Sequence, residues 1–148
     1  MSRNVFVHSG PSRYVQSISV GPHVLQADEP SDSGGNDAGP NPYELLLAAL
    51  GACTSMTVRM YAERKQWPLQ GVQVSLSHAR IHAEDCAECD TKIGMVDRIE
   101  AEVSFTGDLS EDQQRKLFEI ANKCPVHRTL VSRVQIDSKL IVSSSPSP

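Results

Sequence analysis

The sequence has little of what nucleic-acid binding, export or membrane insertion requires. Aromatic residues make up 5% of its 148 residues, the 18 acidic residues outnumber the 14 basic ones, and the net charge is −4. Because no basic stretch is interleaved with aromatic residues, this composition argues against a nucleic-acid-binding surface. Residues 1–10 lack the apolar core of a secretory signal, and the uncharged run 45–58 is too short and too rich in small and polar residues to span a bilayer. We therefore expect a cytoplasmic protein with neither nucleic acid nor membrane as a partner.

Signatures of cofactor binding are also missing. Gly34 and Gly35 lie in a polar stretch and not in a phosphate-binding loop between a strand and a helix. A nucleophile elbow with its serine, histidine and aspartate is absent as well, so the sequence predicts no cofactor. What it does contain is four cysteines. In a chain without an export signal they favour redox or metal chemistry over a disulfide framework, and three pairings remain open.

The first third of the chain has the pattern of β-strands. Apolar and β-branched residues cluster at residues 5–7, 14–20 and 23–27. The break Gly21-Pro22 between the last two runs is typical of a hairpin whose turn begins with glycine. Residues 28–40 are rich in Asp, Ser, Gly and Pro, and predict a loop.

A long helix is predicted after this loop. Asn41 is a favourable N-cap, Pro42 suits the first helical position, and Glu44 completes a capping box. Residues 45–58 are apolar or small on every side, which is typical of a buried helix, and Trp67-Pro68 marks its end. We expect this helix to run through the core with sheets wrapped around it.

The second half predicts two strands and another helix. The strands are expected at residues 72–82, where apolar and polar residues alternate, and at 99–105. The helix should open with a capping box at Ser110, carry Cys124 on its inward face, and be stopped or kinked by Pro125.

A final strand is expected at residues 131–142. Strands and helices then follow one another without βαβ alternation, which predicts an α+β fold. We assign residues 1–142 to one domain and residues 143–148, rich in Ser and Pro, to a disordered tail.

Two cysteines form the most informative pair. Cys53 lies in the middle of the predicted buried helix and Cys124 on the inward face of the second helix, and facing helices can bring two thiols within disulfide reach. Each alone is explained as a small core residue. Together they suit peroxide reduction, in which a thiolate becomes a sulfenic acid and a second thiol condenses with it. Such a thiolate needs a positive group, most simply an arginine held by a carboxylate, and Glu44 is a candidate for that carboxylate as well as for the capping box.

Two segments resemble one protein family. Residues 39–54, GPNPYELLLAALGACT, resemble the first-cysteine signature of the OsmC/Ohr family, and residues 123–130, KCPVHRTL, resemble the second. The resemblance extends over nearly the whole chain. It implies an OsmC-like fold, in which a long buried central helix is wrapped by antiparallel sheets in an intertwined homodimer.

The same resemblance implies an antioxidant, stress-response function. Cys53 would be the peroxidatic cysteine, Cys124 the resolving one, and Glu44 the partner of a catalytic arginine. Organic hydroperoxides would be the substrates, and an external dithiol or lipoyl group would reduce the redox-active disulfide.

The catalytic arginine is the point where the sequence departs from the family pattern. One branch carries it in the first hairpin, where Arg13 is the nearest match and our candidate. Another branch carries it in the loop before the central helix, but residues 28–40 contain no arginine. Arg128, beside Cys124, is a lesser candidate.

A second departure is the series H-x₃-H-x₃-C-x₂-C formed by His78, His82, Cys86 and Cys89. It could supply four zinc ligands, but the two histidines would lie about 13 Å apart on an extended strand. The two cysteines could instead form a local redox disulfide, or have no defined chemistry. We assign no metal site here.

Two rival functions follow from these departures. Without an arginine at Cys53, the protein could be a non-catalytic dimer that binds an apolar ligand in its interface cavity. Alternatively, it could be a module stabilised by zinc at Cys86 and Cys89.

Overall fold

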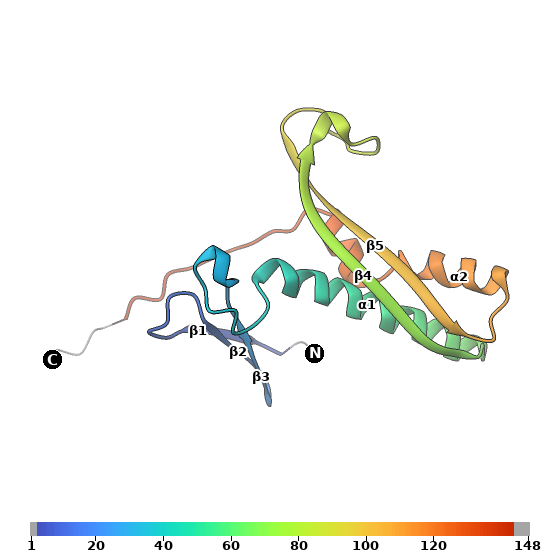
Figure 1. The fold of residues 1–148 in the computed structure, drawn as a ribbon, viewed down its shortest axis with the longest axis horizontal. Coiled ribbons are helices and arrows are strands. Elements are labelled where there is room, and N and C mark those ends of the chain that lie inside the picture. The colour runs from blue at the N-terminus through green and yellow to red at the C-terminus, as the bar shows by residue number, and fades with distance from the viewer. Residues whose placement is uncertain (1–2, 144–148) are drawn as a thin grey trace.

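The N-terminal part of the chain is a small antiparallel sheet. The computed structural model describes residues 3–143, and Figure 1 shows its elements in chain order. The sheet has the order β1-β2-β3 and consists of β1 (Val5–Ser9), β2 (Gln16–Val20) and β3 (His23–Ala27). In the turn between β2 and β3, Gly21 has a φ of +55°, which glycine adopts without steric cost. The predicted strands and hairpin are confirmed here.

The loop from β3 to the first helix contains one short 3-10 helix, η1 (Ser31–Ser33). The two ends of the loop are joined by a hydrogen bond from the Asp28 N–H to the Pro40 carbonyl (3.2 Å). Gly39 passes so close to β3 that a Cβ atom there would lie 2.2 Å from the carbonyl oxygen of Gln26. The predicted loop is therefore a tightly packed segment, not a loose connection.

Helix α1 (Pro42–Lys65) begins with the predicted capping box. The Asn41 side chain accepts a hydrogen bond from the Glu44 N–H, and the Glu44 carboxylate accepts one from the Asn41 N–H, both at 2.9 Å. The helix ends at Gln66, whose backbone is left-handed with a φ of +56°. The Arg59 guanidinium then ties α1 to the next strand by donating to the carbonyl of Leu69 at 2.8 Å.

Only one side of α1 is buried within this chain. That side consists of Leu50, Gly51, Thr54, Val58 and Ala62, whereas Met56 and Met60 on the rest of the helix are 66% and 70% exposed. The prediction of a helix covered all round is therefore not met by a single chain, because β4 (Leu69–His82), α2 (Glu111–Ala121) and α3 (Pro125–Val131) pack on one side of it only. By length and composition α1 could also cross a membrane, which we had not expected of residues 45–58, although core helices pass the same test.

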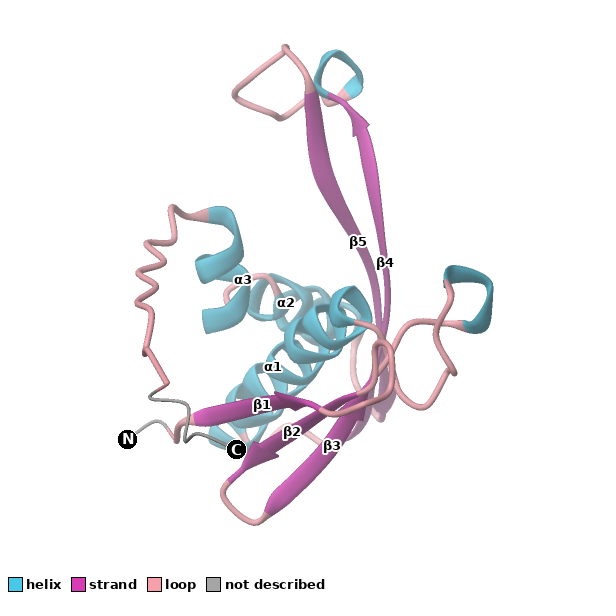
Figure 2. Cartoon of the chain, turned by 90° about the vertical axis from the view of Figure 1, so that its left-hand side faces the viewer, coloured by secondary structure: helices cyan, strands magenta, loops and turns pink. Residues whose placement is uncertain are grey.

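The second sheet is a long two-stranded ribbon. It pairs β4 (Leu69–His82) with β5 (Met95–Gly107) in antiparallel register, and it crosses α1 before extending away from the helices (Figures 1 and 2). The predicted alternation is confirmed over residues 72–77, because the apolar side chains there are half-buried and the polar ones are exposed. The connection at the far end of the ribbon includes a second 3-10 helix, η2 (Ala83–Asp85).

The prediction that Cys124 lies on the second helix is wrong. Helix α2 (Glu111–Ala121) has the predicted capping box at Ser110 but ends before Cys124. Cys124 has an extended backbone and is the N-cap of a separate helix, α3 (Pro125–Val131). The physical reason is Pro125, since a proline disfavours helical backbone in the residue before it and suits the first position of a new helix.

The predicted strand at 131–142 is also wrong for the single chain. Residue 131 ends α3, and residues 132–143 have neither helix nor strand. A strand requires a neighbouring edge for its N–H and C=O groups, and this segment has no strand partner within residues 3–143. Its apolar side chains are exposed: Val134, Ile136, Leu140, Ile141 and Val142. Residues 144–148 of the predicted tail lie outside the described residues.

The core lies where α1, α2 and the base of the ribbon meet. Its buried members share one cluster on these elements: Val58, Ala62, Leu69, Leu117 and Ala121. The architecture is thus α+β, as the sequence predicted, with a central helix against which one ribbon and two shorter helices pack (Figure 2).

Candidate functional site

The two predicted redox cysteines lie on elements that pack together. Cys53 is half-buried in the middle of α1, and Cys124 is fully buried at the start of α3, with 0% exposure. The residue after Cys53, Thr54, has its hydroxyl oxygen 3.7 Å from the Cys124 sulfur. The chain segment that carries Cys124 therefore lies against the turn of α1 that carries Cys53.

Two polar contacts hold the sulfur of Cys124. The Thr54 hydroxyl donates its one hydrogen to the Leu50 carbonyl at 2.8 Å, which leaves its oxygen free to accept from the Cys124 S–H. The Cys124 sulfur in turn accepts the backbone N–H of His127 at 3.3 Å. One donated and one accepted bond hold this sulfur in a fixed position beside α1.

A cavity of about 310 Å³ adjoins this pair of contacts. Thr54 and His127 both line it, and most of its remaining wall is apolar. That wall is built from α1, β5, α2 and α3 by residues that include Leu50, Ile99, Val103, Phe118 and Leu130. Such a cavity can hold a small molecule that is largely apolar.

Glu44 and Arg13 are not joined in this structure. The Glu44 carboxylate is exposed and accepts the Asn41 N–H of the capping box. The Arg13 guanidinium lies over the ring of Tyr14, 4.7 Å from its centroid, and against Gly34 in the loop before α1. Within residues 3–143, neither Arg13 nor Arg128 forms an ion pair with Glu44.

Asp28 is a residue that the sequence did not single out. Its carboxylate is buried at the start of the loop and accepts the backbone N–H groups of Glu29, Asn36 and Ala38 at 2.8, 2.9 and 3.1 Å. Burial alone would raise the pKa of Asp28, but these three donors outweigh burial and lower it. Asp28 thereby fixes the loop that leads to Glu44. The available signal was an acidic residue directly after a strand, at the start of a glycine-rich loop.

Of the three alternatives for the Cys86 and Cys89 motif, the structure contains the local disulfide. His78 lies elsewhere, with its ring stacked on Tyr43 at 4.5 Å and its Nε2 2.9 Å from a carboxylate oxygen of Asp97. Among residues 3–143, no three His, Cys, Asp or Glu side chains are grouped so as to hold a metal ion. With the two sulfurs bonded to each other, the zinc-ligand set is not assembled.

A protein-family comparison decides the classification of this chain. The family model described as "OsmC-like protein" matches residues 34–139. The chain belongs to the OsmC-like family. The match contains both cysteine segments and most of the helices and strands, so the resemblance stated from those segments is confirmed.

Solved OsmC-like structures share the fold. An OsmC-like protein from Mycoplasma pneumoniae aligns with a TM-score of 0.68 at 17% identity, over 88% of this chain and 87% of that chain. An organic hydroperoxide resistance protein OsmC from Legionella pneumophila gives 0.64 at 18% identity, over 88% and 90%. The organic hydroperoxide resistance protein OhrB of Bacillus subtilis gives 0.60 at 15% identity, over 88% and 91%. At these identities the likeness shows the OsmC-like fold alone, and no curated protein matches the chain significantly.

Proposed function

We propose that this OsmC-like protein is a thiol-dependent peroxidase that reduces organic hydroperoxides with Cys53 and Cys124. The observation that carries the proposal is the 3.7 Å contact between the Thr54 hydroxyl and the Cys124 sulfur. It brings a second thiol against the helical turn that bears Cys53. The names of the Legionella and Bacillus neighbours, both organic hydroperoxide resistance proteins, support the same activity.

The reaction balances with two thiols and one external reductant. The Cys53 thiol first loses its proton; its thiolate attacks a peroxide oxygen, the O–O bond breaks, and Cys53 becomes a sulfenic acid. The alkoxide that leaves takes up one proton, equal to the one that Cys53 released, and departs as the alcohol. The Cys124 sulfur then attacks the Cys53 sulfur, so that an S–S bond forms and the hydroxyl leaves as water with the Cys124 proton. An external dithiol or lipoyl group returns two electrons and two protons by thiol–disulfide exchange. The apolar cavity beside Thr54 suits the organic part of such a peroxide.

Arg13 and Glu44 complete the proposed site. A thiolate at Cys53 requires a nearby positive charge, and a carboxylate orients an arginine through charge-assisted hydrogen bonds. Arg13 lies against Gly34, in the loop that continues to Glu44. In the proposed active form the Arg13 guanidinium turns from Tyr14 toward Glu44 and Cys53.

We further propose that the active protein is an intertwined homodimer in the cytoplasm. Three apolar surfaces of the single chain are left uncovered: the outer side of α1, the exposed side chains of the β1-β2-β3 sheet, and residues 132–143. Exposed apolar surface of this extent marks an interaction site. A second copy that covers all three would complete the burial predicted for α1 and give residues 131–142 a strand to pair with.

The test of the peroxidase is consumption of cumene hydroperoxide, with dihydrolipoamide and dithiothreitol compared as electron donors. We expect turnover by the unmodified protein and none by Cys53→Ser. Cys124→Ser should complete one turnover and accumulate a sulfenic acid that dimedone traps. Equal rates for the unmodified protein and Cys53→Ser would rule out the proposal.

A second function is favoured by one observation, the separation of Arg13 from Glu44. With Cys53 unactivated, the 310 Å³ cavity would serve a protein that binds an apolar ligand without reaction. A protein that binds a fluorescent fatty acid and consumes no hydroperoxide would support this alternative.

A further inference from the structure

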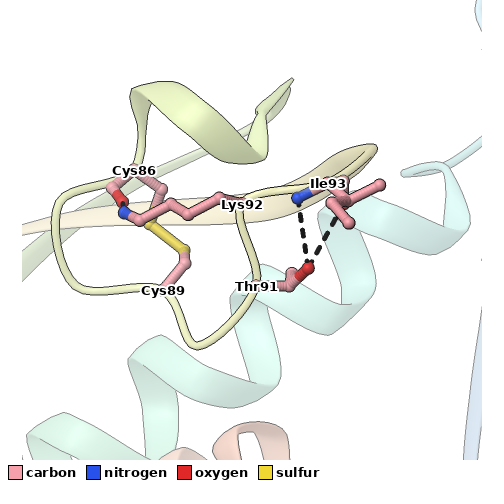
Figure 3. Close-up of a disulfide and its surroundings, with 5 residues drawn as sticks. All are labelled: Cys86, Cys89, Thr91, Lys92 and Ile93. Atoms are coloured by element: carbon pink, nitrogen blue, oxygen red, sulfur yellow. Dashed lines mark hydrogen bonds between the residues drawn. A yellow bond between two sulfur atoms is a disulfide. The ribbon is translucent and has the colours of Figure 1, made fainter.

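The end of the β4–β5 ribbon carries a disulfide that the proposed peroxidase does not use. Cys86 and Cys89 are bonded to each other across two intervening residues, with their Cα atoms 5.5 Å apart. Figure 3 shows the bond within one turn of the connecting loop. This turn stands well away from the three helices (Figures 1 and 2).

The ribbon is held together without this disulfide. After one irregularity between Leu69 and Gly71, the register of β4 and β5 continues without interruption to the pair His82 and Met95. Beyond it, the N–H of the fully buried Ala83 donates to the Gly94 carbonyl at 2.8 Å and closes the base of the loop. Because the stabilisation from a disulfide grows with the length of the loop it closes, a bridge across two residues contributes little. Its breakage and re-formation can therefore proceed on a ribbon that stays folded.

The disulfide lies on an exposed, acidic loop, and its two cysteines are half-buried. Ala87 and Glu88, between the two cysteines, are exposed, and Ile93 nearby is 88% exposed. Four carboxylates lie on this loop and are opposed by one lysine, Lys92, whose Nζ donates to the Cys86 carbonyl (Figure 3). The carboxylates belong to Glu84, Asp85, Glu88 and Asp90.

We propose that Cys86 and Cys89 form a second, independent thiol–disulfide exchange site, which reacts with external dithiols of neutral or positive charge. The dithiol's thiolate attacks one of the two sulfurs, the Cys86–Cys89 bond breaks, and a mixed disulfide forms. The second thiol of the dithiol then attacks the mixed disulfide. Two electrons and two protons pass to the cysteine pair, and the dithiol leaves as a cyclic disulfide.

The negative charge of the loop determines which reductants react. An anionic thiol is repelled as it approaches, whereas a neutral dithiol of equal reactivity is not. Because thiol–disulfide exchange is reversible, an oxidised dithiol can take the two electrons back from the reduced pair. The Cys86–Cys89 site therefore distinguishes external dithiols by their charge.

The experiment uses the full chain with Cys53→Ser and Cys124→Ser, so that only the Cys86–Cys89 pair can react. The oxidised protein is treated at neutral pH, without denaturant, with dihydrolipoamide or with its anionic analogue dihydrolipoate. Thiols are trapped by alkylation and counted by mass spectrometry. We expect two new alkyl groups per chain, several-fold faster reduction by dihydrolipoamide, and complete re-formation of the disulfide with oxidised lipoamide.

A charge variant and a fold measurement make the test decisive. Glu88→Gln combined with Asp90→Asn should bring the rates of reduction by dihydrolipoamide and by dihydrolipoate closer together. Added salt should have the same effect. Circular dichroism should be unchanged on reduction. Reduction that occurs only in denaturant, that unfolds the ribbon, or that proceeds equally with both reductants would overturn the proposal. Failure of the peroxidase would not, because the pair is assayed without Cys53 and Cys124.

Discussion

The two cysteine pairs of this protein differ in almost every physical respect. Cys124 is fully buried against the turn of α1 that bears Cys53, and a hydroxyl and a backbone N–H hold its sulfur. Cys86 and Cys89 are close in sequence, already bonded and half-buried, on an exposed loop that carries four carboxylates. The comparison indicates that the surroundings of each cysteine pair determine which reagent can react with it. The apolar cavity beside Thr54 suits a small apolar peroxide, whereas the exposed loop at the ribbon end is open to a larger, carrier-bound dithiol.

The largest expected effect is on hydroperoxide turnover, which should depend on one cysteine pair and not on the other. Cys53→Ser should lower hydroperoxide turnover by about 10³-fold or more, because removal of a nucleophile abolishes the covalent step. Cys89→Ser should retain turnover, since the ribbon end lies away from Cys53. Steady-state peroxide consumption with dithiothreitol measures both. A comparable loss in Cys89→Ser would show that the pairs are coupled and not independent.

The second effect concerns the positive charge that we propose for the interior pair. Arg13→Gln should slow the first step by roughly 10- to 100-fold, since a charge-assisted hydrogen bond is worth about 1.5–3 kcal/mol. The single-turnover rate of sulfenic acid formation measures it, and Arg128→Gln is the matched control. A loss in Arg128→Gln alone would transfer the role to that residue. The rate of reduction of the Cys86–Cys89 disulfide should be the same in both variants as in the unmodified protein.

The elements that the sequence predicted correctly are those with local signals. The two capping boxes, at Asn41 and at Ser110, involve residues three positions apart, and strand alternation repeats every second residue. Both patterns are complete within a short stretch of chain. They could therefore be recognised without knowledge of the tertiary structure.

The errors concern elements whose state depends on distant partners. The strand expected at 131–142 needs an edge to pair with, and the covering of α1 needs a second surface, so neither is settled by local pattern. Pro125 was recognised as a stop, but its capacity to start a new helix after Cys124 was not. In the site, the cysteines follow from sequence, whereas the contact of Thr54 with Cys124 depends on how α3 packs on α1.

The third effect tests that contact directly. Thr54→Val should remove the acceptor for the Cys124 thiol and slow formation of the Cys53–Cys124 disulfide by about two- to tenfold, as expected for loss of one hydrogen bond of about 0.5–1.5 kcal/mol. The lifetime of the Cys53 sulfenic acid, measured by dimedone trapping, reports this step. Thr57→Val, also on α1 and half-buried, is the control and should leave the lifetime unchanged. If both variants behave alike, the contact does not position Cys124.

The smallest effect is a difference in how the two regions respond to acid. Burial would raise the pKa of Asp28, but the N–H groups of Ala38, Asn36 and Glu29 lower it overall. A lowered folded-state pKa means that the contribution of Asp28 to stability is complete above its unfolded-state value, about 3.9, and is lost as the pH falls through the lower folded-state value. At the ribbon end the Cys86 N–H donates instead to the Ala83 carbonyl, a group that does not titrate.

Amide hydrogen exchange measured in steps below pH 5 distinguishes the two responses. The amides of Asn36 and Ala38 should lose protection as Asp28 is protonated, after correction for the intrinsic pH dependence of exchange, while that of Cys86 should keep it. Asp28→Asn provides the control, since its loop should show weak protection at every pH. Parallel changes in the two regions would mean that acid acts on the whole fold, and that Asp28 does not govern the loop that leads to the Cys53 helix.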